Sequence, residues 1–145
     1  MEPIRISQIN YSLAHSSVET FGDNTLVCMD TKEFRWYKKH DFPVMAFSPQ
    51  AKGFFAKLAK GDAANNLPEG QYAGPANLAR LAKVKQLSEQ TGDTPAKITL
   101  GYLNSQPFFV SSVFAVTKLW QLDEDMEAQD LTYDPKTVAF LENMI

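Results

Sequence analysis

Side chains that commonly carry out chemistry are few in this chain and are scattered along it. Cys28 is the only cysteine, so it cannot form an internal disulfide, and a single free thiol fits a reducing cytosol. Because no histidine lies near it in the sequence, we expect Cys28 to be a packed or exposed residue rather than a nucleophile. No group of His, Cys and carboxylate residues has the spacing of metal ligands, so the sequence predicts no metal site.

Length and composition favour one globular domain over residues 1–145. The net charge of −3 excludes binding of polyanions through bulk charge, and no nucleic-acid recognition motif is present. No apolar run is long enough to span a membrane, and the first six residues have no apolar signal core. We therefore expect a cytoplasmic protein.

Three segments have the pattern of β-strands, at 4–9, 42–47 and 109–116. The second is apolar on both faces, as buried parallel strands are. The segment 12–30 is rich in Ser, Gly, Asp and Asn, and 54–75 contains Asn-Asn-Leu-Pro-Glu-Gly, so both are expected to be long loops.

Helices are expected between and after these strands. Leu78, Leu81, Val84 and Leu87 recur on one face of a helix, and Leu119, Leu122 and Met126 form the apolar stripe of another. The expected helices are 32–40, 77–90, 95–105, 118–128 and one opening at Asp134-Pro135. Their expected end residues are Thr31, Gly92, Thr94 with Pro95, and Thr117.

Strands that alternate with helices predict a parallel sheet, and so an α/β fold. Such a sheet binds ligands at the carboxyl ends of its strands. The residues that follow each strand are therefore the ones in which a binding site is expected.

Four segments in a fixed order resemble the aldo/keto reductase family. They are Ser7-Gln8-Ile9-Asn10-Tyr11-Ser12-Leu13, the stretch from Val44 through Phe47-Ser48-Pro49-Gln50-Ala51-Lys52-Gly53 to Phe55, the helix pair from Asn77 to Phe108, and Val113 to Asp125. The match is to the C-terminal half of the family, strands six to eight of its (β/α) barrel. The resemblance implies a partial barrel with about three parallel strands and flanking helices.

The family's catalytic residues, an Asp, a Tyr, a Lys and a His, would all lie in the half that this chain does not match. None of the five tyrosines lies in the family's catalytic-tyrosine motif, and neither His15 nor His40 matches its histidine. Carbonyl reduction needs a proton donor beside the carbonyl oxygen. No catalytic residue is therefore expected here.

The resemblance implies instead that the chain holds the cofactor side of the site. Gln8 matches the glutamine that hydrogen-bonds the nicotinamide carboxamide, and Phe47 matches the aromatic residue that stacks on that ring. The positions that match the loop around the pyrophosphate are Ser48, Gln50, Lys52 and Gly53.

A second set of positions matches the adenosine side of an NADP(H) site. Thr117 and Lys118 match the 2′-phosphate site, and Gln121, Glu124 and Asp125 match the face of the helix that lies along the adenosine. Two of the family's usual residues are replaced, in both cases unfavourably for the phosphate.

Where the family has a small Pro-Gly or Pro-Lys turn, this chain has Phe114-Ala115, which approaches a phosphate less closely. Where it has an asparagine, this chain has Asp125, whose charge repels a phosphate. Both changes are expected to weaken NADP(H) binding. Taken singly, each candidate also has an ordinary structural role: Gln8 can satisfy a backbone group, Phe47 can be core, and lone lysines are usually solvated.

A partial barrel leaves two sheet edges and one sheet face uncovered. Three arrangements would resolve this: self-association, which we favour, a complementary N-terminal half on another chain, or a fourth strand from the strand-like residues 25–28. Two functions remain open. The chain is a segment of an NADP(H)-dependent carbonyl oxidoreductase, acting on a small carbonyl substrate only when completed, or a non-catalytic module derived from that family that oligomerises or binds a nucleotide or another small ligand.

Overall fold

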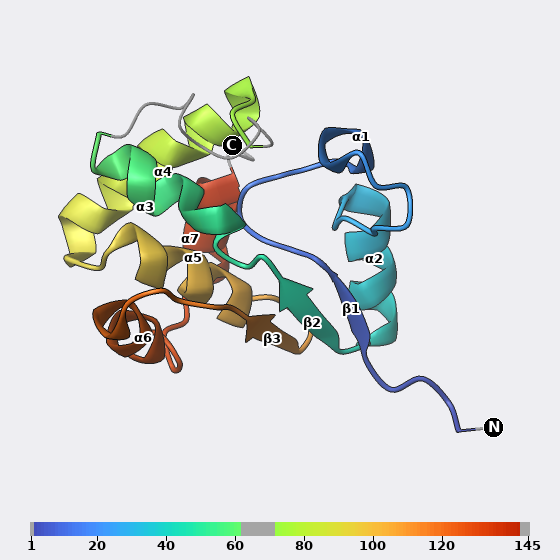
Figure 1. Cartoon of the computed structure of the whole chain (residues 1–145). Coiled ribbons are helices and arrows are strands. Elements are labelled where there is room, and N and C mark those ends of the chain that lie inside the picture. The colour runs from blue at the N-terminus through green and yellow to red at the C-terminus, as the bar shows by residue number, and fades with distance from the viewer. Residues whose placement is uncertain (1, 62–71, 143–145) are drawn as a thin grey trace.

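Three short parallel strands form the centre of the molecule (Figure 1). The computed structural model describes residues 2–61 and 72–142. The strands are β1 (Ser7–Asn10), β2 (Val44–Phe47) and β3 (Val110–Val113), in the order β1-β2-β3. Both pairings are parallel, so the expected α/β sheet of three strands is confirmed.

The two faces of the sheet differ in burial. Val44 and Ala46 of β2 are fully buried, and Ile9 of β1, which pairs with Ala46, is nearly so. Met45, one residue along, is only half-buried, and its β1 partner Gln8 is exposed. Because successive side chains of a strand point to opposite faces, one face packs into the core and the other is left partly open.

Seven α-helices and one short 3₁₀ helix are found in the described residues. They are α1 (Val18–Phe21), α2 (Thr31–His40), a 3₁₀ helix (Ala51–Gly53), α3 (Phe54–Ala59), α4 (Pro75–Thr91), α5 (Pro95–Asn104), α6 (Leu119–Met126) and α7 (Pro135–Glu142). All five helices expected from the sequence are present, each with ends within a few residues of the expected ones.

The prediction of two long loops was wrong in part, because each segment contains a helix. The first contains α1, and its residue Cys28 forms a single parallel bridge with Asn10. In the described part of the chain, this bridge is the only trace of a fourth strand at 25–28, which was one of the three arrangements considered. The second loop begins with α3, whose Phe54 and Phe55 are buried in the core. Its residues 62–71 lie outside the described ranges.

Helix ends were predicted well where glycine and proline set them. Gly92 ends α4 in the left-handed conformation, with φ of 80°. Thr94 accepts a hydrogen bond from the backbone N–H of Lys97, and Pro95 is the first residue of α5. These ends follow from backbone geometry that few other residues allow.

Two predicted N-caps were wrong, because another side chain nearby accepts the hydrogen bonds from the first N–H groups of the helix. The carboxylate of Asp30, not Thr31, accepts hydrogen bonds from the first N–H groups of α2. At the start of α6, Thr117 does not cap the helix. Gln121 reaches back and accepts from the backbone N–H of Lys118.

The predicted apolar face of two helices also required correction. On α4, Leu78 is 43% exposed while Asn77 is buried, because Asn77 bonds the backbone of His15 in both directions at 2.8 and 2.7 Å. On α6, Leu119 is 82% exposed, and the remaining stripe residues are exposed as well. The stripe of α6 is therefore a surface feature in this structure.

Gly101 of α5 marks where that helix meets the segment before α7. A methyl group there would lie 2.8 Å from Cε2 of Tyr133 and 2.9 Å from Cγ of Leu131. We expect Gly101→Ala to destabilise the fold by about 1–3 kcal/mol, because overpacking outweighs the better helix propensity of alanine.

The measurement is the free energy of unfolding from urea titration. Gly74→Ala is the control, because nothing lies within 4 Å of the added methyl group there. A Gly101→Ala chain as stable as the wild type would show that α5 does not pack closely on Leu131 and Tyr133.

Candidate cofactor-binding site

β1 and β2 present an amide and an aromatic ring on the same face of the sheet, from Gln8, the second residue of β1, and Phe47, the last residue of β2. Gln8 pairs with Met45, and Asn10 pairs with Phe47, so Gln8 and Phe47 are diagonal neighbours with the same orientation. Gln8 is exposed and Phe47 is half-buried. The structure thus brings together the two residues expected on the nicotinamide side, on the open face of the sheet.

The loop that leaves β2 has an unusual backbone. Ser48, Ala51 and Lys52 have φ values of 52°, 50° and 56°, although none is glycine, and Gly53 has φ of 81°. Each non-glycine residue in this conformation costs free energy and persists only where its surroundings enforce it.

Packing and hydrogen bonds hold this loop. The N–H of Ala51 donates to the carbonyl of Ser48, and that of Gly53 to the carbonyl of Gln50, both at 2.9 Å. Ala51 is 1% exposed, and Phe54, the first residue of α3, is fully buried. Strained backbone of this kind gathers at binding and catalytic sites.

Two lysines give the loop positive charge. The Nζ of Lys57 donates to the backbone carbonyl of Lys52 at 2.9 Å. The Nζ of Lys52 lies 5.7 Å from the ring centroid of Phe21, in α1. Cationic side chains around a backbone turn are suited to an anionic ligand.

The loop after β2 is bonded directly to α6. Nε2 of Gln50 donates to Oδ1 of Asp125 at 2.6 Å, across 75 residues of sequence. Asp125 is 4% exposed. Burial raises its pKa, the hydrogen bond from Gln50 opposes that shift, and the nearby charge of Glu124 adds to it. Gln50, expected at the pyrophosphate, and Asp125, expected at the adenosine, are therefore in direct contact.

At the start of α6, the side chain of Gln121 accepts hydrogen bonds from the two residues that precede the helix. Oε1 of Gln121 accepts from the backbone N–H of Thr117 at 3.1 Å, from its hydroxyl at 3.2 Å, and from the N–H of Lys118 at 3.0 Å. Three residues expected on the adenosine side are thus bonded to one another. Glu124 is half-buried one turn further along.

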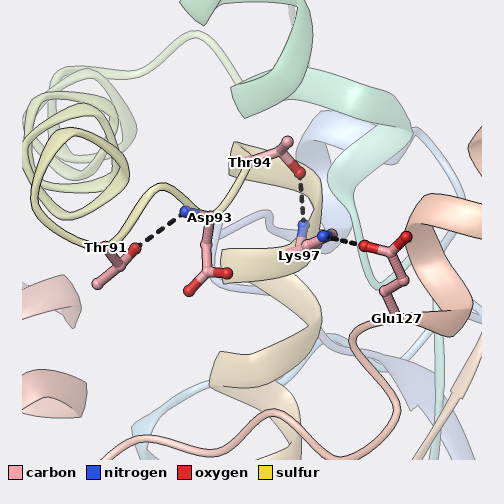
Figure 2. A network of polar contacts seen from close by, with 5 residues as sticks. All are labelled: Thr91, Asp93, Thr94, Lys97 and Glu127. Atoms are coloured by element: carbon pink, nitrogen blue, oxygen red, sulfur yellow. Dashed lines mark hydrogen bonds and ion pairs between the residues drawn. The ribbon is translucent and has the colours of Figure 1, made fainter.

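The far end of α6 is fixed to α5, as Figure 2 shows. Lys97 forms an ion pair with Glu127, which raises the pKa of Lys97. The backbone N–H of the same lysine is held by Thr94. In the turn just before α5, the N–H of Asp93 donates to the hydroxyl of Thr91 at 3.1 Å. Of these contacts, the ion pair between Lys97 and Glu127 is the one that joins α6 to α5.

The sequence analysis missed a polar cluster formed by His15, Asn77 and Arg80, of which Asn77 and Arg80 are buried. Nη1 of Arg80 donates to Oδ1 of Asn77 at 3.1 Å, and Nη2 lies 3.3 Å from Nε2 of His15. Burial, aided by the charge of Arg80, lowers the pKa of His15. The cluster ties the segment after β1 to α4. Its signal in the sequence is the Asn77–Arg80 spacing, which a helix places on one face.

Four of the tyrosines are made weaker acids by their burial. Burial is the largest cause that raises the pKa of Tyr11, Tyr72 and Tyr102, and it raises that of Tyr133 to about 12. Within residues 2–61 and 72–142, no three His, Cys, Asp or Glu side chains gather as metal ligands would. None of the helices in those ranges is long and apolar enough to cross a membrane.

A three-stranded parallel sheet with connecting helices fits part of a (β/α) barrel. The model of the aldo/keto reductase family matches residues 3–145, and the chain belongs to that family.

Solved structures share the fold of this chain. A thermostable aldo-keto reductase in complex with the inhibitor epalrestat is 14% identical, with a TM-score of 0.63, over 99% of this chain and 41% of that one. An aldo/keto reductase from Klebsiella pneumoniae in complex with NADP and acetate is 19% identical, with a TM-score of 0.60, over 96% and 38%. A Klebsiella pneumoniae aldo-keto reductase in complex with NADPH is 17% identical, with a TM-score of 0.57, over 94% and 38%. The chain thus spans about two fifths of the length of these structures.

Replacement of Asp125 by asparagine should make the folded chain less sensitive to pH. Because the pKa of Asp125 is raised, the folded chain binds its proton more tightly than the unfolded chain does. Its contribution to stability therefore falls as the pH rises through the folded pKa. Asp125→Asn keeps an oxygen for Gln50 but cannot ionise. Relative to the wild type, it should gain stability as the pH is raised from about 4 to about 7.

Urea unfolding at several pH values measures this difference. Asp123→Asn, at an exposed position on the same helix, is the matched control and should show a smaller change. A difference between Asp125→Asn and the wild type that stays constant with pH would rule out a buried, titrating carboxyl group at this position.

Proposed function

We propose that this chain forms the dinucleotide side of an aldo/keto reductase site and binds NADP(H) at the carboxyl ends of its strands. The strained loop from Ser48 to Gly53 carries the proposal, because three of its residues pay a conformational cost without glycine. Together with Lys52 and Lys57, this loop forms a compact cationic turn that suits the pyrophosphate.

The open face of the sheet fits the nicotinamide end. The ring of Phe47 offers a flat apolar surface, and the amide of Gln8 can both donate to and accept from a carboxamide. Stacking and two-way hydrogen bonding together would fix which face of the ring points into the barrel. Bound there, NADP(H) would supply or accept a hydride.

The adenosine end fits less well. Asp125 places a carboxylate where the family has an amide, and it already has a partner in Gln50. Ala115 stands where a glycine or lysine is usual. We therefore expect NADP(H) to bind more weakly than it does to a complete reductase. Most of the binding free energy should come from contacts to the nicotinamide and the pyrophosphate, and little from contacts to the 2′-phosphate.

The isolated chain is not expected to reduce a carbonyl. Reduction adds a hydride to carbon and a proton to oxygen, and the proton needs a donor beside that oxygen. The tyrosines with raised pKa values do not meet this need. Carbonyl reduction would require a further segment that brings the acid. A cytoplasmic location also belongs to this proposal, on the ground of the free thiol of Cys28.

Nucleotide binding can be measured by titrating NADPH and following its fluorescence. Saturable binding is expected, and Phe47→Ala should weaken it by roughly tenfold through loss of stacking. Lys52→Ala should weaken it by a similar factor and reduce its dependence on salt. Lys85→Ala, at an exposed position of α4, is the matched control for removal of one positive charge.

Two results would count against the proposal. One is no binding at millimolar NADPH by a chain whose circular dichroism shows it to be folded. The other is equal weakening by Lys52→Ala and Lys85→Ala, which would indicate a general electrostatic attraction. Turnover of a carbonyl substrate by the purified chain alone would contradict the missing proton donor.

A further inference from the structure

Cys28 lies beside the last residue of β1. It forms a single parallel bridge with Asn10, and it is half-buried. The N–H of Asn10 donates to the carbonyl of Val27, and the N–H of Met29 donates to the carbonyl of Asn10, both at 2.8 Å. Because these two bonds hold the residues on either side of Cys28, its thiol has a fixed place next to β1.

Ser16 connects this thiol to the side chain of Asn10. Oγ of Ser16 donates to Oδ1 of Asn10 at 2.8 Å, and it also lies 3.8 Å from Sγ of Cys28, within range of a hydrogen bond to sulfur. The three residues come from the end of β1, the segment before α1 and the segment before α2. The sequence around Cys28 therefore does not reveal its partners, which the fold supplies.

Two hydrogen-bond donors near this thiol have no acceptor. Nδ2 of Asn10 and Oη of Tyr72 are buried and have no hydrogen-bond partner among the described residues. Asn10 is 2% exposed and Tyr72 is 3% exposed. A buried donor without a partner costs free energy unless another group satisfies it.

The hydroxyl of Tyr72 faces the same residues. Burial raises the pKa of Tyr72, the polar side chain of Asn10 opposes this shift, and the negative charge of Cys28 as a thiolate adds to it. The centroid of the tyrosine ring lies 6.2 Å from that of Phe21 and 6.2 Å from that of Phe54. These aromatic contacts hold the ring in place, so its hydroxyl is directed in advance toward the thiol.

Asn10, Ser16, Cys28 and Tyr72 form what we call the Cys28 cluster. What the cluster lacks is a strong hydrogen-bond acceptor near the sulfur atom. An amide N–H and a phenol O–H both donate well to oxygen, whereas a thiol sulfur is a weak acceptor. An oxygen atom bonded to Sγ of Cys28 would be such an acceptor, and it would lie among these donors.

We propose that the Cys28 cluster holds Cys28 as a sulfenic acid after reaction with hydrogen peroxide. The thiolate sulfur attacks one peroxide oxygen, so that an S–O bond forms as the O–O bond breaks. The other oxygen leaves as hydroxide and becomes water with the proton that the thiol has lost. The sulfur is oxidised by two electrons and the peroxide is reduced by two. Nδ2 of Asn10 and Oη of Tyr72 then donate to the new oxygen.

The modification is reversible in a reducing compartment. Because Cys28 is the only cysteine, its sulfenic acid cannot form a disulfide within the chain. A small thiol displaces the oxygen as water and leaves a mixed disulfide, and a second molecule of that thiol then releases Cys28 as the thiol. The cluster thus provides a redox-sensitive site at the end of β1.

This inference does not depend on nucleotide binding. None of the four residues of the Cys28 cluster is among those proposed to contact NADP(H). A chain that fails to bind NADPH can still be oxidised at Cys28, and a chain whose thiol resists oxidation can still bind NADPH.

Dimedone, which reacts with sulfenic acids, measures how long the oxidised state lasts. The wild-type chain is treated with hydrogen peroxide, catalase removes the excess, and a fixed concentration of glutathione is added. Dimedone is then added after increasing delays, and the adduct is measured by intact mass. We expect a single adduct. Tyr72→Phe should shorten the lifetime of the dimedone-reactive state by roughly fivefold, because one hydrogen bond to the sulfenic oxygen is lost.

Tyr133→Phe is the matched control, because Oη of Tyr133 is also buried without a partner but lies in the segment before α7. It should keep the wild-type lifetime, and circular dichroism checks that both variants are folded. In urea, which disperses the cluster, the wild type and Tyr72→Phe should decay at the same rate.

Three results would overturn the proposal. The first is a folded wild-type chain that gives no dimedone adduct. The second is an unchanged lifetime in Tyr72→Phe, which would indicate that a water molecule satisfies this hydroxyl instead of the sulfenic oxygen. The third is equal shortening by Tyr133→Phe, which would indicate a general loss of stability.

Discussion

The structure depends on how a small parallel sheet buries one of its faces much more completely than the other. Val44 and Ala46 are packed completely, and the helices supply the surface against which they pack. Parallel strands normally have both faces covered, because their connections place helices or further strands there. Here the second face keeps Gln8 exposed and Phe47 half-buried. The same arrangement that leaves the sheet incomplete makes its open face available for binding.

Conformational strain and burial of charge are concentrated where the two loops meet. Ala51 and Lys52 hold left-handed backbone, and Asp125 keeps a carboxyl group out of water with Gln50 as its hydrogen-bond partner. Neither feature improves stability, since each costs free energy that the surrounding core must offset. Natural proteins tolerate such costs at binding sites, which is consistent with a loop shaped for a ligand.

The sequence was most informative where local rules decide the structure. Strand periodicity, Gly92 and Pro95 predicted elements that the structure confirms, because these depend on backbone geometry. It was less informative where a distant partner decides. The exposure of Leu119 depends on what covers α6, and the burial of Asn77 depends on the backbone of His15, 62 residues away.

The site shows the same division. Gln8 and Phe47 lie within β1 and β2, so their shared face could be expected from alternation once the sheet was known to be parallel and its register fixed. The bond between Gln50 and Asp125 spans 75 residues, and no sequence pattern announces it. The family resemblance supplied the order of the segments, but the departures from it, such as Asp125, acquire a physical meaning only in the folded chain.

The amide of Gln121 has a consequence for how the chain exists without any ligand. By accepting from Thr117 and Lys118, it fills the place that an anion would take at the start of α6. The apo form is therefore self-sufficient at this helix end and need not fold around a nucleotide. If NADP(H) binds as we propose, a phosphate at this helix end would compete with Gln121, and each displaced hydrogen bond, worth about 0.5–1.5 kcal/mol, would be subtracted from its affinity. The same side chain would thus account both for the closed helix end of the free chain and for the weak phosphate binding that we expect.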